Sequence, residues 1–260
     1  MTYTAFDLSG KTVLVTGGNA GIGLGMCKAL AAAGADIVLW GSNPDKNAQA
    51  HAVLAPSGRR ILTQRVDIAD EAQVISAMAH AVEQMGPLDT VIANAGITNT
   101  PTPFLETTSE QLRKIVSVNL EGTYTTLREA CRHMIERSKA GGPGGSLVIV
   151  GTTGTESGMP RAAPYATSKG GLTSLMRSIV VEHARHGIRV NLIQPGFIQT
   201  DMTERHRADE AVSKWVLANV PQRRWGTSDE FGGIAVYLAS DASLYQNGSV
   251  IVIDGGLLAA

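Results

Sequence analysis

The stretch Thr16-Gly17-Gly18-Asn19-Ala20-Gly21-Ile22-Gly23 decides the fold of this 260-residue chain. It follows an apolar run over Thr12–Thr16 that predicts a buried strand, and a helical pattern over Ile22–Ala33 begins inside it. A second apolar run, Asp36–Trp40, follows that helix. Glycines at such a turn let the backbone approach a pyrophosphate closely, and the helix N-terminus adds partial positive charge. The context predicts a nucleotide site; the alternative is a glycine-rich turn without a ligand.

Apolar runs alternate with amphipathic helical patterns along the whole chain. Strands that are apolar throughout, separated by helices, indicate a parallel sheet that is covered on both faces. We therefore expect one α/β domain over residues 1–260, built on a doubly wound parallel sheet. The other predicted strands are Ile61–Val66, Leu88–Ala93, Ser146–Val150, Ile188–Ile193 and Val250–Ile253. The other predicted helices are Pro44–Leu54, Glu71–Met85, Ser109–Arg137, Ala166–His186 and Asp229–Ala239.

Composition and charge exclude several classes of protein. The formal net charge of -1 gives no strong field to attract nucleic acid or an anionic membrane. No stretch approaches the roughly 18 apolar residues that cross a bilayer, and Met1–Gly10 lacks a signal-peptide pattern. Cys27 and Cys131 fit buried, reduced thiols and a cytoplasmic protein. His183 and His186 have a metal-ligand spacing, but no third ligand is suggested, so no metal site is predicted.

The segment Tyr165-Ala166-Thr167-Ser168-Lys169 places a tyrosine and a lysine on one face of a predicted helix. A phenol has a reference pKa near ~10, and a nearby ammonium would lower that pKa towards working pH, where the phenol could transfer a proton. Tyr-x-x-x-Lys alone is common and uninformative. After the fifth strand of a nucleotide-binding sheet it predicts a proton-transferring pair.

The spacing Thr-Gly-x-x-x-Gly-x-Gly resembles the signature of the short-chain dehydrogenase/reductase family. Asn94-Ala95-Gly96 resembles the second signature of that family, and Asp67 matches its adenine-contacting aspartate. The resemblance covers essentially the whole chain and implies a Rossmann fold. It also implies an NAD(P)-dependent oxidoreductase that interconverts a secondary alcohol and a ketone. Further family positions occur in the expected order at Asn119, Tyr165, Lys169, Pro195-Gly196 and Thr200.

The resemblance implies a role for each catalytic residue. Tyr165 would be the general acid/base, Lys169 would hold the nicotinamide ribose, and Asn119 would anchor a water that relays protons. The family has a serine thirteen residues before the tyrosine, where this chain has Thr152. Thr152 aligns without a gap and is therefore favoured over Thr153. Its hydroxyl is kept, but the added methyl group stiffens the side chain and narrows the pocket.

The cofactor is predicted to be NADP, with NAD left open. Sheets that prefer NAD carry an acidic residue at the end of the second strand, where this chain has Gly41. Ser42 and Asn43 could bond a 2′-phosphate, yet Ala20 and Ser42 stand where basic residues often occur in NADP enzymes. Lys46 could reach inward or be solvated. The predicted cofactor-binding residues are Gly17, Asn19, Gly21, Ile22, Gly23, Ser42, Asn43, Asp67, Ile68, Asn94, Ala95, Gly96, Tyr165, Lys169, Pro195, Gly196, Ile198 and Thr200.

The segment from Asp201 to Val220 mixes charged side chains with Trp215 and predicts a mobile substrate lid; a solvated helix is the alternative. The predicted substrate residues are partly polar, which favours sugar-like or oxygenated cyclic alcohols and leaves a bulky apolar ketone open. They are Thr98, Asn99, Thr152, Glu156, Met159 and Trp215.

Two other functions and the assembly state remain open from the sequence. A catalytically impaired sensor or scaffold protein would be supported by Thr152 alone. An isomerase or dehydratase usually carries a longer C-terminal substrate region than this chain has. The resemblance also implies a homotetramer, in which the helices Ser109–Arg137 and Ala166–His186 pair across one interface, and the last helix and strand pair across the other.

Overall fold

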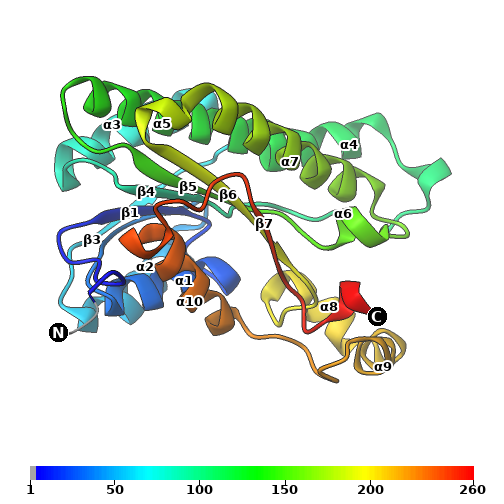
Figure 1. Cartoon of the computed structure of the whole chain (residues 1–260). Helices are drawn as coiled ribbons and strands as arrows, with labels where there is room; N and C mark the ends of the chain where they lie inside the picture. The colour runs from blue at the N-terminus through cyan, green and yellow to red at the C-terminus, as the bar shows by residue number, and fades with distance from the viewer. Residues whose placement is uncertain (1–3) are drawn as a thin grey trace.

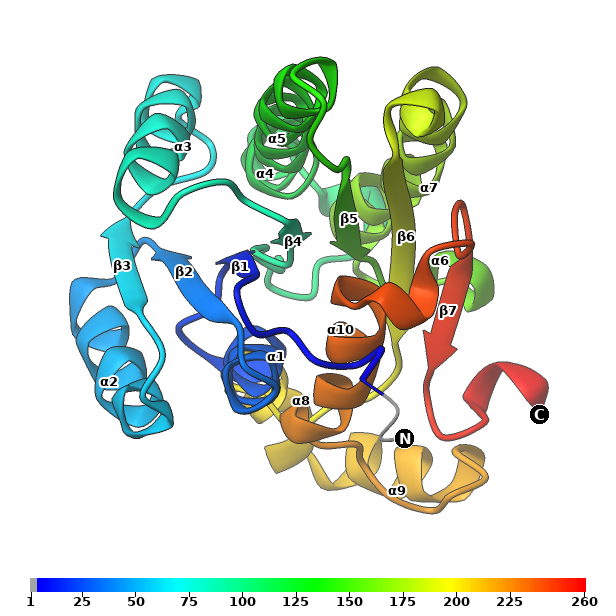
Figure 2. The same cartoon turned by 60° about the vertical axis from the view of Figure 1, so that its left-hand side comes forward.

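The computed structural model describes residues 4–260 and contains one sheet of seven parallel strands in the order β3-β2-β1-β4-β5-β6-β7 (Figure 2). The chain winds outwards from β1 to β3, returns to the other side of β1 and continues from β4 to β7. The predicted doubly wound parallel sheet is confirmed. The strands are β1 (Thr12–Thr16), β2 (Asp36–Gly41), β3 (Ile61–Arg65), β4 (Thr90–Ala93), β5 (Gly145–Val150), β6 (Ile188–Pro195) and β7 (Val250–Ile253).

Helices cover both faces of the sheet (Figure 1). One face carries α3, α4, α5 and α7, and the other carries α1, α2 and α10, while α8 and α9 lie beyond the sheet near the C-terminus. The helices are α1 (Gly21–Ala32), α2 (Pro44–Leu54), α3 (Glu71–Met85), α4 (Ser109–Val116), α5 (Thr123–Lys139), α6 (Gly154–Ser157), α7 (Ala163–His183), α8 (Glu204–Ala208), α9 (Glu210–Asn219) and α10 (Gly232–Ala239).

Alternate strand residues build a separate apolar core on each face of the sheet. Leu14 of β1 is buried in the cluster that includes Leu127 of α5 and Met176 of α7. Its neighbour Val13 is buried in the opposite cluster with Met26 of α1. Because successive side chains of a strand point to opposite faces, a continuous apolar run supplies both cores at once. This double burial fixes the strands and therefore the edge at which their carboxyl ends meet.

The predicted helix over 109–137 is helical along its whole length, but it is not α-helical throughout. A π-helical segment, Ser117–Gly122, separates α4 from α5. Gly122 lies against the end of the β3–α3 connection, where a Cβ atom would come within 2.6 Å of the Ile68 carbonyl oxygen. A π turn inserts one extra residue into a helix and redirects the side chains around it. The residues on both sides of the insertion have helical patterns, so the sequence predicted one helix without the π turn.

Both cysteines are buried and unpaired, as predicted. Burial raises the pKa of the Cys27 thiol and of the Cys131 thiol to about 12, so both are protonated at neutral pH. Across residues 4–260, no helix has both the length and the apolar character that a membrane span requires.

Candidate active site

A cavity of about 320 Å³ lies at the carboxyl edge of the sheet, beside the point where the chain reverses between β1 and β4. Ligands of open α/β sheets bind at such a switch point. The predicted site residues that line it are Gly17, Asn19, Gly21, Ile22, Asn94, Ala95, Gly96, Thr152, Tyr165, Lys169, Pro195, Gly196, Ile198 and Thr200. The sequence prediction missed seven further lining residues or gave them no firm role: Ala20, Lys46, Val150, Gly151, Asp201, Met202 and Thr203.

The glycine-rich turn between β1 and α1 forms one wall of the cavity. Gly17 and Gly21 adopt φ values of +62° and +50°, a region that favours glycine. A Cβ atom on Gly17 would lie 2.9 Å from the Cα atom of Ala95, so the turn passes directly against the end of β4. Ala20 at the N-cap of α1 supplies no side-chain hydrogen bond. The first-turn N–H groups of α1 therefore have no side-chain cap, and such groups bind anions.

Asn94 and Thr16 tie this turn to the second half of the sheet. The Thr16 hydroxyl accepts hydrogen bonds from the backbone N–H groups of Asn94 and Ala95, both at 3.0 Å. The Asn94 side-chain amide donates to the carbonyl oxygens of Thr16 and Gly17, at 3.0 and 3.2 Å. All of these bonds join segments almost eighty residues apart in sequence. They hold the ends of β1 and β4 together at the bottom of the cavity.

At the far end of the cavity, two asparagines form a bridge over the end of β2. Asn19 Nδ2 donates to Asn47 Oδ1 at 2.7 Å, and Asn47 Nδ2 donates to the Gly41 carbonyl oxygen at 2.9 Å. A Cβ atom on Gly41 would come within 2.2 Å of Asn19 Nδ2. No side chain fits at position 41 while this bridge is present. The sequence analysis missed Asn47, although it is a polar residue on the buried face of α2, in register with Ala50 and Leu54.

Five predicted cofactor residues lie outside the lining of the cavity, namely Gly23, Ser42, Asn43, Asp67 and Ile68. Asp67 is exposed beyond the end of β3, and its carboxylate accepts a hydrogen bond from the N–H group of Ala69. Asn43 caps α2 by accepting from the N–H group of Lys46. Ile68 is buried in the core. Cofactor contacts of these five residues stay predictions.

Thr152, Tyr165 and Lys169 meet at the other end of the cavity. Thr152 follows β5, while the other two lie one turn apart in α7. The side chains of Tyr165 and Thr152 form a hydrogen bond. Lys169 is buried with a side-chain ammonium that donates to the Val150 carbonyl oxygen at 2.8 Å. A half-buried tyrosine, a hydroxyl and a buried ammonium therefore share one small volume.

The pKa values of this cluster differ from the sequence-based expectation. Burial raises the pKa of Tyr165 to about 12, and the hydrogen bond with Thr152 opposes this shift without overcoming it. Burial also lowers the pKa of Lys169 to about 8. We expected the ammonium to lower the tyrosine pKa. In the structure that ammonium is bonded to the Val150 carbonyl, and desolvation disfavours the charged form of both groups.

Comparison with known proteins agrees with this geometry. A family model described as Enoyl-(Acyl carrier protein) reductase matches residues 17–258. The gluconate 5-dehydrogenase of Gluconobacter oxydans (strain 621H) is 36% identical over 252 residues, which cover 97% of this chain and 96% of the relative. The 5-keto-D-gluconate 5-reductase of Escherichia coli (strain K12) is 33% identical over 98% of each chain.

The chain belongs to the short-chain dehydrogenase/reductase family. A solved gluconate 5-dehydrogenase from Burkholderia cenocepacia J2315, in complex with NADP and tartrate, superposes with a TM-score of 0.92. The two sequences are 33% identical, and the match covers 99% of this chain and 98% of the solved chain. As a member of this family, the chain is an NAD(P)-dependent oxidoreductase of alcohols and ketones. The alternative of an impaired sensor or scaffold protein finds no support among these relatives, which are named as enzymes.

Thr152 and Thr153 differ in what their hydroxyl groups contact. The Thr153 hydroxyl is buried and donates to the Pro195 carbonyl oxygen at 3.1 Å. The Thr152 hydroxyl instead accepts a hydrogen bond from the N–H group of Gly154 at 3.2 Å and meets Tyr165. Thr152 lines the cavity and Thr153 does not, while the role of Thr152 as counterpart of the family's serine stays a prediction.

Asn119, the remaining family position, lies behind the cavity and does not line it. Its side chain is fully buried and forms a pair of hydrogen bonds with the backbone of Ile97, at 2.8 and 2.9 Å. It also donates to the Ser168 hydroxyl at 3.1 Å. A Cβ atom on Gly96 would be 3.1 Å from Asn119 Oδ1 and 3.3 Å from Lys169 Nζ. The π-helical segment thus brings the Asn119 side chain close to the buried ammonium.

Five predicted substrate residues do not line the cavity: Thr98, Asn99, Glu156, Met159 and Trp215. Asn99 donates to the Arg161 carbonyl oxygen at 3.1 Å, and Glu156 accepts from Gln194 at 3.1 Å. The ring of Trp215, in α9, lies edge-on to Phe197 with centroids 5.6 Å apart. Substrate contacts of these residues stay predictions.

Because the Lys169 pKa is lowered from its usual value near 10.5 to about 8, stability should depend on pH in that window. Between these two pH values Lys169 binds more protons in the unfolded chain than in the folded one, so the free energy of unfolding rises with pH. Below about pH 8 the full cost of the buried charge is present. We expect wild type to gain about 2 kcal/mol relative to Lys169→Met between pH 7 and pH 9.5. Denaturant unfolding at both pH values measures this, and parallel pH dependence in the two proteins would contradict the shift.

Proposed function

We propose that this chain is an NADP-dependent oxidoreductase that interconverts a hydroxyl and a keto group on a sugar acid. The observation that carries the proposal is the meeting of Thr152, Tyr165 and Lys169 at one end of a cavity whose other end carries the glycine-rich turn. The names of the Gluconobacter oxydans and Escherichia coli relatives support a sugar acid as substrate. Tartrate in the Burkholderia cenocepacia structure is likewise a polar hydroxy acid.

The cavity fits a dinucleotide, because uncapped N–H groups of α1 and the Gly17–Gly21 turn provide an anion cradle. NADP is favoured over NAD, since the Asn19–Asn47 bridge leaves no room at Gly41 for the carboxylate that NAD-preferring sheets carry. The NADP in the Burkholderia cenocepacia structure supports the same choice. When bound, the nicotinamide supplies or accepts the hydride. Tyr165, Lys169, Asn94 to Gly96, and Pro195 to Thr200 would hold the rest of the cofactor.

Tyr165 would act as the general acid and base. With a pKa of about 12, its phenol carries its proton throughout the neutral range and can give it to the oxygen of a ketone. Thr152 would hold that oxygen through its hydroxyl and so orient it towards Tyr165. Lys169 would hold a ribose hydroxyl and keep positive charge beside the phenol as it loses its proton. Asn119 would anchor a water between Lys169 and solvent.

Substrate selection is proposed to come from the residues above the cavity. Thr98, Asn99, Glu156 and Met159 would surround the substrate, beneath a lid over residues 200–220 that contributes Trp215. In the structure this segment comprises α8 and α9 and rests on a small apolar cluster with Val216, Val220 and Trp225. A small separate cluster lets such a segment move without disturbing the two main cores. We propose that residues 1–260 form a single domain that carries this lid.

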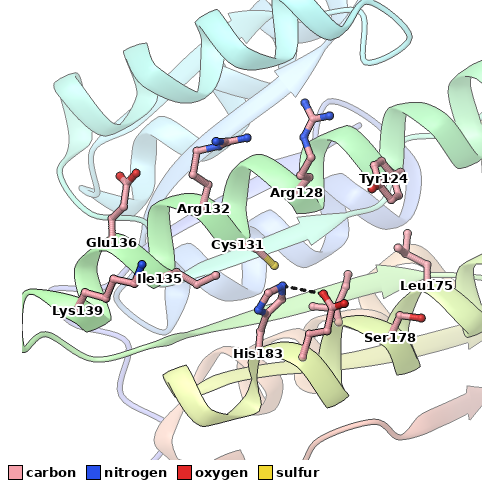
Figure 3. Close-up of a pocket in the computed structure, with 12 residues that line it drawn as sticks. Tyr124, Arg128, Cys131, Arg132, Ile135, Glu136, Lys139, Leu175, Ser178 and His183 are labelled. Atoms are coloured by element: carbon pink, nitrogen blue, oxygen red, sulfur yellow. Dashed lines mark ion pairs between the residues drawn. The ribbon is translucent and has the colours of Figure 1, made fainter.

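We also propose a homotetramer. Figure 3 shows a groove between α5 and α7, with Cys131 at its base and side chains from both helices along its sides. Charged residues of opposite sign, Arg128 and Glu136, lie on the same rim as Tyr124. On the edge strand β7, Val250 and Val252 are 36% and 43% exposed. Exposed apolar positions on an edge strand and a groove between two long helices suit contact with further copies of the chain.

A cytoplasmic location is proposed from the two buried, unpaired thiols, which suit a reducing compartment. The formal net charge of -1 offers no surface field for nucleic acid or an anionic membrane. The partner is therefore a small molecule.

Turnover should require the Tyr165 hydroxyl. With NADPH and 5-keto-D-gluconate, read as loss of absorbance of the reduced nicotinamide, Tyr165→Phe should lower kcat by roughly 10²- to 10⁴-fold. The affinity for NADPH, measured by calorimetry, should change less than about twofold, because the ring is retained. If sugar acids do not react and an apolar ketone does, the proposed substrate class is contradicted. A fully active Tyr165→Phe variant would contradict the role of the tyrosine.

Thr152→Val keeps the shape of the side chain but removes its hydroxyl, and should lower kcat by roughly 10²-fold or more. Thr152→Ser should retain most activity. The matched control, Thr153→Val, loses only the bond to the Pro195 carbonyl and should cost about 1 kcal/mol of stability while kcat stays within a few-fold. Steady-state kinetics and denaturant unfolding distinguish the two. The reverse pattern would assign the role to Thr153.

Light scattering after size exclusion should give a mass near four times the 27.3 kDa of one chain. Leu175→Arg, which places a charge in the groove between α5 and α7, should shift this mass towards smaller species. A wild-type mass near that of one chain would refute the tetramer.

A further inference from the structure

An ion pair between the start of α2 and the segment that follows Thr200 lies among the residues that line the cavity. Lys46 Nζ lies 2.5 Å from a carboxylate oxygen of Asp201, and both residues line the cavity. Lys46 belongs to the first turn of α2, and Asp201 directly follows Thr200 at the start of the lid segment. Among the residues that line this cavity, Lys46, Lys169 and Asp201 are the charged ones. Lys169 serves the opposite end, so Lys46 is the cation of the α2 end.

Lys46 follows closely in the chain after the part of the sheet where a 2′-phosphate is recognised, and it lines the cavity. In dinucleotide-binding sheets the end of the second strand faces the 2′ position of the adenosine ribose. Here that strand ends at Gly41, and the Asn19–Asn47 bridge passes over it. Lys46 immediately precedes Asn47, whose side chain is fixed by hydrogen bonds to Asn19 and to the Gly41 carbonyl oxygen. The backbone of Lys46 is therefore fixed next to this subsite, within reach of its long side chain.

The bond between Lys46 and Asp201 is of a kind that another anion can replace. The two side chains are 44% and 71% exposed. Ion pairs as exposed as this contribute little net stability, because water solvates both separated charges well. A phosphate dianion carries more charge than a carboxylate and forms strong charge-assisted hydrogen bonds with an ammonium. Exchange of Asp201 for a phosphate at Lys46 is therefore favourable.

We propose that Lys46 is the residue that selects NADP over NAD, and that Asp201 competes with the 2′-phosphate for its ammonium. The inference rests on the proposed use of NADP. It assigns two opposite effects to two residues in contact: Lys46 raises the affinity for the phosphorylated cofactor, and Asp201 lowers it. Because Asp201 begins the lid segment, the same exchange releases the lid from α2 when the phosphorylated cofactor binds.

The test is the affinity of four proteins for NADPH and NADH, measured by titration calorimetry without substrate. Lys46→Gln should weaken NADPH binding by roughly tenfold or more, the scale of a charge-assisted hydrogen bond, and change NADH binding by less than twofold. Asp201→Asn should tighten NADPH binding by roughly two- to fivefold and leave NADH binding unchanged. In the double variant the gain from Asp201→Asn should disappear, because the residue it competes for is absent.

A second ion pair in the same chain provides a matched control. Lys28 and Asp229 are 2.7 Å apart with side chains 45% and 67% exposed, nearly the values of the first pair, but neither lines the cavity. Lys28→Gln and Asp229→Asn should leave both affinities unchanged. Thermal melting of all variants reports whether each is folded. The affinities for adenosine 2′,5′-bisphosphate and for adenosine 5′-monophosphate repeat the comparison without the nicotinamide.

The outcomes separate this inference from the proposed function. The inference would be overturned if wild type binds NADPH tightly but Lys46→Gln keeps its affinity for both cofactors, or loses affinity for both equally. The proposed function would still stand in that case. Asp201→Asn that fails to tighten NADPH binding would overturn the competition. Wild type that binds NADH alone would instead overturn the proposed cofactor.

Discussion

The buried ammonium of Lys169 is the constraint on which the rest of the site depends. Its hydrogen bond to the Val150 carbonyl draws α7 against the end of β5, and this contact brings Tyr165 to Thr152. A buried charge of this kind is costly, which is why its pKa falls to about 8. The neighbouring residues accommodate it closely: a side chain on Gly96 would crowd Nζ, and Asn119 lies just behind. The apolar cores on both faces supply the stability that tolerates such a group.

The architecture of the chain was predictable because each part of it has a local signal. Strands buried on both faces produce continuous apolar runs, and the turn after Thr16 has a glycine pattern that few other structures need. The placement of Thr152 was also predictable, since it depends only on counting residues back from Tyr165. The fold class and the central part of the site follow from patterns of this kind.

The features that could not be predicted depend on contacts between segments that are distant in the sequence. The π turn at Ser117–Gly122 depends on the approach of Ile68 to Gly122, which no local pattern contains. The direction of the Tyr165 pKa shift depends on where the Lys169 ammonium points, and a spacing of four residues does not give that. Asp201 and Lys46 are 155 residues apart and were each compatible with full solvation. Their pairing becomes visible only when the carboxyl edge of the sheet is assembled.

The two ends of the cavity handle charge in opposite ways, and this difference follows from burial. Lys169 is shielded from water, so its ammonium needs a hydrogen-bond partner such as the Val150 carbonyl oxygen. Lys46 is half exposed, so its bond to Asp201 is weak enough to be replaced by a ligand. A site that must hold a proton at one atom needs the first kind of cation. A site that must admit and release a phosphorylated ligand needs the second, and the parallel sheet places one of each at the two ends of the same crevice.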